Sequence, residues 1–300
     1  MKTKTYLFAL MTMALTLGSC SDNENGIGGE TSKYITVSTS IGNMTRVATD
    51  EKGGQTFEEG DEISVYAWTG DATTVPAATG RVVDNAINKL TKGAWISTPQ
   101  MLWKNNRDKH YFIGVYPTKA ISDLTAGEYA FDETKQVESD LLVAVNKDGL
   151  SYNVDEQQTV PLTFTHVMAK LVVNLTYKNQ WGGIPTVEKV VVGNAAKEAT
   201  INYLTKVVTP STTAKEDFSL PEITENTKYV SVIIPQEEVT QLTIVIGGKN
   251  FVYDNGTPFK LESGKITTVN LEVGRDEIKL GDVKITNWED GSTFSGEALN

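Results

Sequence analysis

Nucleophilic catalysis needs a base beside a serine, threonine or cysteine, and this sequence offers few bases for that purpose. Its only histidines are His110 and His166, and its only cysteine is Cys20. His166 lies in Phe164-Thr-His-Val-Met-Ala-Lys170, beside apolar residues, where a histidine more often packs near a core than catalyses. The sequence therefore does not favour a catalytic triad.

Metal and nucleotide chemistry lack their usual motifs as well. The sequence contains no His-Glu-x-x-His pattern, cysteine pair or Walker loop. The spacing of Asp71, Asp132 and Asp140 does not match a calcium loop, and Glu58-Glu-Gly-Asp-Glu62 is typical of a solvated turn. A glycosidase needs only two carboxylates that flank a cleft, so a carboxylate-based hydrolase stays open as an alternative. We expect no enzymatic activity, no metal and no cofactor.

The chemistry that the sequence does indicate is a covalent modification of Cys20. Two lysines precede the apolar run Tyr6–Leu17, which is shorter than the ~20 residues that a membrane-spanning helix needs. The run ends in Leu17-Gly-Ser-Cys20, which resembles the lipobox of bacterial lipoprotein precursors. That resemblance implies a signal peptide over residues 1–19, cleavage between Ser19 and Cys20, diacylglycerol on the cysteine sulfur, and acylation of the new amino terminus with a fatty acid such as palmitate.

The residues after Cys20 and the net charge indicate where the protein is found. Residues 20–32 are polar, acidic and glycine-rich, which is typical of a flexible tether. An acidic stretch in this position resembles the signal with which some Gram-negative bacteria send lipoproteins to the outer cell surface. We therefore expect a lipid-anchored, surface-exposed protein of the outer membrane. The formal charge of −11 disfavours nucleic acid and anionic lipid headgroups as partners.

The rest of the chain alternates apolar and polar residues with a period of two, which predicts β-strands throughout. In the first such run, Ile35, Val37, Thr39 and Ile41 alternate with other polar residues. Gly247-Gly-Lys-Asn250 separates two later runs and predicts a tight hairpin. The other runs are Ile63–Ala67, Tyr111–Tyr116, Leu141–Val145, Ala169–Leu175, Val230–Ile234, Leu242–Ile246, Phe251–Tyr253, Val269–Val273 and Val283–Ile285. Many short strands with frequent turns predict an all-β fold of sandwiches or barrels.

The length predicts about two domains. The polar stretch Asp155–Pro161 ends in proline and divides the mature chain into nearly equal halves, so we expect domains at residues 33–160 and 161–300. A second candidate boundary is Asn179–Gly183. With a single cysteine and hence no intrachain disulfide, each domain must depend on its apolar core.

A series of short motifs runs in order over nearly the whole mature chain. They are Phe57-Glu-Glu-Gly-Asp-Glu-Ile-Ser-Val-Tyr-Ala67, Trp103, Tyr111-Phe-Ile-Gly-Val-Tyr-Pro117, Asp140-Leu-Leu-Val-Ala144, Leu162-Thr-Phe-Thr-His-Val-Met-Ala-Lys-Leu171, Ile234-Pro-Gln236, Ser263-Gly-Lys265 and Ile285-Thr-Asn-Trp-Glu-Asp-Gly291. Each motif is weakly specific, but in this order they resemble the fimbrillin family of surface lipoproteins, in particular the Mfa-like fimbrillins.

The resemblance implies two tandem transthyretin-like β-sandwich domains. It also implies a structural or adhesive role, as a stalk, tip or accessory subunit, in cell-surface fimbriae. In family members that polymerise, an arginine-specific protease removes the first strand of the N-terminal domain, and a strand of a neighbouring subunit fills the gap. Main-chain hydrogen bonds give such a pairing strength, and alternate side chains in pockets give it specificity. Other fimbrial subunits are therefore the expected partners, with a host or bacterial surface ligand as a further one.

Arg46 matches the position of that cleavage. Met44-Thr-Arg-Val-Ala48 follows the first strand, Lys33–Ile41, in a polar segment suited to proteolysis between Arg46 and Val47. An ordinary loop arginine is the alternative. Cleavage there would detach the lipid and the strand together.

The C-terminal end departs from the pattern of a stalk subunit, which needs a strand that it can donate. Only Ser292–Asn300 follows Trp288-Glu-Asp-Gly291, and this segment is a poor strand. A tip, accessory or anchor subunit therefore fits as well as a stalk. The alternative from another class is a non-polymerising, glycan-binding surface lipoprotein. The glycan-binding alternative predicts a row of solvent-exposed tryptophans, whereas tryptophans buried in the cores would favour a fimbrial subunit. The tryptophans are Trp68, Trp95, Trp103, Trp181 and Trp288.

Overall fold

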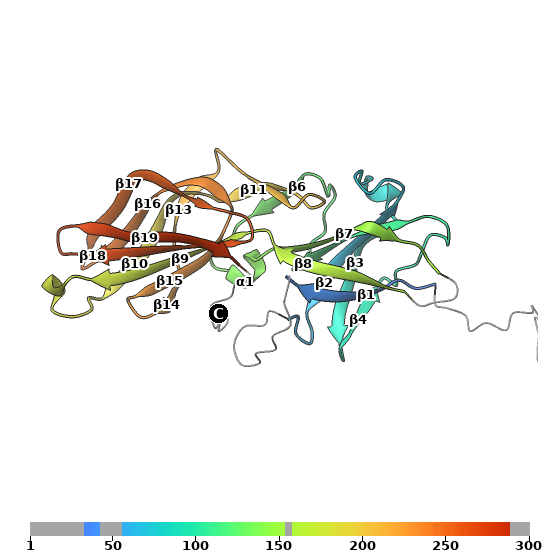
Figure 1. Cartoon of the computed structure of the whole chain (residues 1–300), viewed down its shortest axis with the longest axis horizontal. Helices are drawn as coiled ribbons and strands as arrows, with labels where there is room; N and C mark the ends of the chain where they lie inside the picture. Colours follow the sequence, from blue (N-terminus) through green and yellow to red (C-terminus); the bar gives the residue numbers. More distant parts are fainter. Residues whose placement is uncertain (1–32, 43–55, 154–157, 289–300) are drawn as a thin grey trace, which may run out of the picture. The chain divides into compact units, whose positions relative to one another are not determined.

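The structure, a computed structural model, describes residues 33–42, 56–153 and 158–288. Within these ranges nearly all regular structure is β-strand, and the strands form four sheets (Figure 1). The helical segments are short, with α1 at Gln136–Ser139 and two 3-10 turns, η1 at Ala78–Gly80 and η2 at Asn179–Trp181. Among the described residues, no helix is long and apolar enough to cross a membrane. The prediction of an all-β sandwich fold is confirmed.

The largest sheet contains most of the N-terminal half of the chain. Its seven strands lie in the order β1-β8-β7-β5-β2-β3-β4. They are β1 (Thr36–Ile41), β2 (Glu62–Thr69), β3 (Val83–Thr91), β4 (Ala94–Thr98), β5 (His110–Tyr116), β7 (Leu142–Leu150) and β8 (Thr159–His166). Neighbouring strands are antiparallel except β1 and β8, which run parallel. β1 also lies against β4, so the two edges of this sheet meet.

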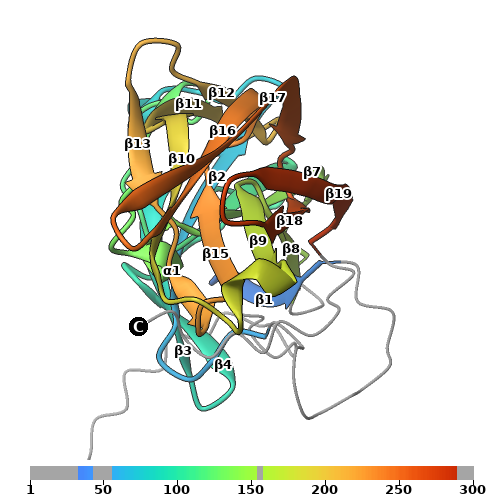
Figure 2. The ribbon, with the colours of Figure 1, turned by 90° about the vertical axis from the view of Figure 1, so that its left-hand side faces the viewer.

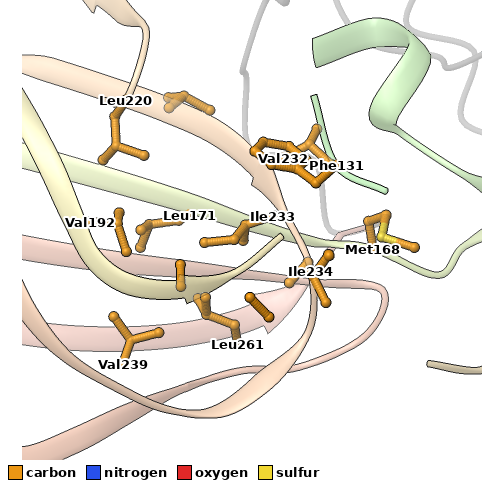
Figure 3. Packing of buried hydrophobic residues seen from close by; sticks show 14 of the residues in the cluster. Phe131, Met168, Leu171, Val192, Leu220, Val232, Ile233, Ile234, Val239 and Leu261 are labelled. Atoms are coloured by element: carbon orange, nitrogen blue, oxygen red, sulfur yellow. The ribbon is translucent and has the colours of Figure 1, made fainter. Parts of the chain in front are cut away.

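Two sheets face each other in the C-terminal half and form a sandwich (Figure 2). One sheet has the order β13-β10-β16-β17, and the other has the order β14-β15-β9-β18-β19. The strands are β9 (Ala169–Tyr177), β10 (Val187–Ala196), β13 (Lys215–Ser219), β14 (Glu222–Thr224), β15 (Lys228–Ile233), β16 (Gln236–Ile246), β17 (Lys249–Leu261), β18 (Lys265–Val273) and β19 (Ile278–Asn287). Leu171 and Ile233 from the second sheet share a buried core with Val192, Val239 and Leu261 from the first (Figure 3).

A three-stranded sheet connects segments from the two halves of the chain. Its order is β12-β11-β6, with β6 at Gly127–Ala130, β11 at Glu198–Asn202 and β12 at Val207–Pro210. Strand β8 continues through Pro161, and the chain leaves the seven-stranded sheet for the sandwich at Val167. Two tandem domains remain our proposal, and the strand assignments would put their boundary at this point.

Candidate functional site: the first strand and its groove

β1 is one edge strand of the seven-stranded sheet, and the residues just before it also contact the segment that follows the opposite edge strand, β4. β1 pairs in parallel with β8 over its whole length. Before the strand begins, the N–H of Ile35 donates to the carbonyl of Met101 at 3.0 Å. The N–H of Trp103 donates to the carbonyl of Lys33 at 3.1 Å. The first strand therefore bridges β8 and the segment that follows β4.

The side chains of β1 complete the core of this sheet. Ile35 and Val37 point inward and are 1% and 6% exposed. The residues around them in the same buried cluster include Met101, Phe112 and Leu162. Burying an aliphatic side chain of this size contributes about 1.5–3 kcal/mol relative to leaving it exposed. The core is therefore incomplete without β1.

A groove of about 870 Å³ runs between β1 and β4. The indole N–H of Trp95, on β4, donates to Thr39 Oγ1, on β1, at 3.0 Å. Phe57 lines the same groove and stands edge-on to Trp95, Tyr116 and Phe164, with ring centroids 5.1–5.3 Å apart. The aromatic residues that hold Trp95 in place all follow Arg46 in the sequence.

The last strand, β19, lies at an open edge of the sandwich. Among the described residues it pairs with β18 alone, and its side chains Val283 and Ile285 are 36% and 38% exposed. Directly after the strand, Trp288 is buried and its ring stacks on His166, with centroids 4.1 Å apart and planes inclined by 7°. The N–H of Trp288 donates to the carbonyl of Gly264 at 3.0 Å. β19 is thus attached by its ladder with β18, by Trp288, and by Ile278 and Leu280, which are partly buried and pack against the core.

The stack of Trp288 on His166 brings together residues from several of the fimbrillin-like motifs found in the sequence. Nδ1 of His166 lies 2.7 Å from Oδ1 of Asp140. The ammonium of Lys170 lies 5.3 Å from the centre of the Trp288 ring. Burial lowers the pKa of Lys170 from its ordinary value, because desolvation disfavours the charged form. His166 is buried and held by packing and hydrogen bonding, as the sequence predicted.

The modification and processing sites predicted from sequence lie outside the described residues. These are Ser19 and Cys20 for signal cleavage and lipidation, and Arg46 and Val47 for proteolysis. All four remain predictions. The structure does describe the strand that ends five residues before Arg46 in the sequence, at Ile41.

Two contacts that define the site were not foreseen from the sequence. They are the hydrogen bond from Trp95 to Thr39 and the stack of Trp288 on His166. Each joins residues that are distant in sequence, so no local motif points to the pair. The alternation around Thr39 did place that residue on the inward face, which was the one available signal.

Comparison with protein-family models matched residues 45–288 to the fimbrillin-like family. The chain belongs to the fimbrillin-like family. The matched range begins after β1 and ends at Trp288, so it includes all the strands of this fimbrillin-like protein except β1. A search of curated proteins gave no match.

Solved structures share the fold of this fimbrillin-like chain. A candidate cell adhesion protein from Bacteroides uniformis is 18% identical with a TM-score of 0.64, over 86% of this chain and 100% of that one. A second candidate cell adhesion protein, from Bacteroides ovatus, is 17% identical with a TM-score of 0.62, over 85% and 98%. The tip fimbrial protein Mfa3 from Porphyromonas gingivalis is 10% identical with a TM-score of 0.50, over 77% and 95%.

Proposed function

We propose that this protein is a structural or adhesive subunit of cell-surface fimbriae that assembles by proteolytic removal of β1 and strand exchange between subunits. The observation that carries the proposal is the position of β1, an entire strand that completes a core and precedes Arg46 in the chain. After a cut between Arg46 and Val47, only hydrogen bonds and packing would hold β1, since the single cysteine allows no disulfide within the chain.

Removal of β1 would leave an unpaired strand edge and an exposed core, which another strand could fill. β8 would lose its parallel partner, and the core around Phe112 and Leu162 would lose Ile35 and Val37. Unpaired strand edges and exposed apolar surface both favour the addition of a strand from elsewhere. The emptied position would therefore act as an acceptor for another subunit.

β19 is our proposed donor of that strand. Its outer edge is unpaired in the described part of the chain, and Val283 and Ile285 are only partly buried, with 36% and 38% of their surface exposed. A donor that is only partly buried on its own subunit gains apolar burial on transfer, which favours exchange. At ten residues, β19 is long enough to donate, whereas the segment after Trp288 is a poor strand. This length supports a stalk role in addition to the tip and accessory roles.

The lipid would hold the subunit at the outer membrane before cleavage. Cys20 lies on the same side of Arg46 as β1, so one cut would release the subunit from its anchor and open its acceptor position. We further propose that the protein has no catalytic activity and acts through its assembly and surface contacts.

The tryptophans do not support the glycan-binding alternative. Trp68, Trp103 and Trp288 are buried. Trp95 and Trp181 are half-buried, and their indole N–H groups donate to protein oxygens at 3.0 Å. Sugar-binding platforms present exposed ring faces, whereas these rings belong to cores and strand junctions.

The test is to purify surface fibres from the wild type and from an Arg46→Ala strain and to identify the chain and its amino terminus by mass spectrometry. We expect the wild-type chain in fibres to begin at Val47 and the variant to be missing from them. Arg107→Ala is the matched control, because Arg107 is exposed in a loop and lies far from β1 in sequence; it should assemble normally. Absence of the chain from fibres in every strain, or an intact segment from Cys20 to Val47 in wild-type fibres, would contradict the proposal.

A further inference from the structure

The inward face of β1 contains one polar residue between apolar ones. Ile35, Val37, Thr39 and Ile41 share this face, and Thr39 is half-buried. Its hydroxyl oxygen accepts the indole N–H of Trp95 at 3.0 Å. Because β4 and β1 are opposite edges of one sheet, this hydrogen bond links the strand to an edge with which it has no backbone ladder.

Trp95 is held by residues that do not belong to β1. It pairs with Leu90 across the β3–β4 hairpin, and its ring stands edge-on to Phe57 at 5.3 Å. Phe57 in turn contacts Tyr116 and Phe164. All of these follow Arg46 in the chain, so the indole keeps its support when β1 departs.

An indole nitrogen can only donate, which gives the groove a chemical preference. A strand with an oxygen acceptor at the Thr39 position satisfies this N–H. A strand with an aliphatic residue there covers the N–H and leaves it without a partner, and an unsatisfied donor is penalised by its lost solvation. Valine and threonine have nearly the same shape, so the preference concerns the hydrogen bond rather than size.

We propose that Trp95 determines the specificity of strand exchange and the direction of the incoming strand. It selects a strand with two aliphatic residues at the Ile35 and Val37 positions and a hydrogen-bond acceptor at the Thr39 position. This inference rests on the proposed function, since it describes the strand that replaces β1.

The occupant that fits this rule is β19 of a second copy of the chain. Val283, Ile285 and Asn287 have the same spacing and the order aliphatic, aliphatic, acceptor. In that register β19 runs parallel to β8, as β1 does. In the opposite direction the third position falls on Gly281, which has no side-chain acceptor. Ile278, Leu280 and Asp282 follow the same order, so within β19 the rule fixes the direction of the incoming strand and admits two registers.

The test measures the binding of labelled peptides to the full mature chain after treatment with an arginine-specific protease. One peptide has the sequence of residues 33–42 and the other that of residues 281–290. We expect both to bind, and Thr39→Val or Asn287→Leu in the peptide to weaken binding about fivefold, the effect of one hydrogen bond. Ser38→Val is the matched control, since Ser38 is exposed on the other face, and it should leave binding unchanged.

The second arm uses Trp95→Phe protein, which keeps an aromatic ring against Phe57 but removes the N–H. The Thr39→Val and Asn287→Leu peptides should then bind as well as their parents. The role of Trp95 is overturned, while strand exchange stands, in either of two cases. In one, the Trp95→Phe and wild-type proteins prefer the parent peptides over the Thr39→Val and Asn287→Leu peptides to the same degree; in the other, neither protein prefers them. Binding of the β1 peptide without the β19 peptide overturns the second copy as donor. Failure of both peptides to bind after β1 has left overturns the proposed function and this inference together.

Discussion

His110 is buried beneath the segment that holds the start of β1. Its Nε2 accepts the N–H of Lys104 at 3.0 Å, and its Nδ1 lies 3.0 Å from the carbonyl of Asp108. A neutral ring with its proton on Nδ1 satisfies both contacts, whereas a charged ring would direct a second N–H at the donor of Lys104. The ring also stands edge-on to Trp103, at 5.0 Å. Burial lowers the pKa of His110 because desolvation disfavours the imidazolium.

A lowered pKa makes stability depend on pH in a defined direction. Below the ordinary histidine pKa of about 6.5, the unfolded chain takes up a proton that the folded chain does not, so the free energy of unfolding falls as pH falls. Above that pH the contribution of His110 is constant. We predict the following for the free energy of unfolding, measured with urea between pH 7.5 and 5. Its slope against pH should be up to about 1.4 kcal/mol per pH unit steeper in the wild type than in His110→Gln.

The comparison isolates His110 because both proteins retain His166, whose effect cancels in the difference. His110→Gln is expected to be less stable at every pH, so the slope and not the absolute stability is the readout. Parallel pH profiles for the two proteins would show that His110 is not held neutral by the fold.

At the scale of the strands, β1 and β19 differ in how firmly they are attached. The first strand and the residues just before it bury Ile35 and Val37 in a core, and they pair with β8 and with the segment that follows β4. β19 leaves Val283 and Ile285 partly exposed and is held by β18, by Trp288 and by the partly buried Ile278 and Leu280. Apolar burial decides the difference, since each fully buried aliphatic side chain contributes about 1.5–3 kcal/mol. β1 should therefore need covalent cleavage before it can leave, whereas β19 should open more readily than β1.

Trp288→Ala should loosen β19 without unfolding the sandwich. The change removes the stack on His166 and the contact with Lys170. We predict that amide hydrogen exchange at Ile278–Asn287 accelerates at least about tenfold, while exchange in β15 is unchanged, because local openings are set by local contacts. Ile285→Ala on the same strand is the control and should have little effect, since its side chain is already 38% exposed. Equal acceleration in both variants would contradict the role of Trp288 as the attachment point.

The strands were largely predictable because period-two alternation is a local property. The hairpin at Gly247 and Gly248 is confirmed, with φ values of 58° and 71° that suit glycine and join β16 to β17. Pairing was not predictable, since β1 and β8 are separated by more than a hundred residues. Pro161 indicated a break, yet β8 tolerates it because the ladder with β7 covers only the end of β8, from Phe164 to His166.

At the scale of the whole molecule, the order of features along the chain links anchoring to assembly. Cys20, β1 and Arg46 follow one another, and the domain that would accept a new strand comes after them. Several acyl chains, at about 0.8 kcal/mol per buried methylene, make spontaneous release from a membrane negligible. Cleavage at Arg46 would then be the only route by which the subunit leaves its anchor. Because the same cut opens the acceptor position, the uncut chain would not assemble before export.

This coupling predicts where a fatty-acid label is found. In cells grown with labelled palmitate, the wild-type chain in fibres should be unlabelled, and the Arg46→Ala chain should be labelled and remain in the outer membrane. Cys20→Ser should carry no label in either background, which is the control for the attachment site. Label on a wild-type chain within purified fibres would mean that the lipid and β1 are retained in the assembled subunit. In that case the acceptor position stays closed by its own strand, and the chain must join the fibre through another surface.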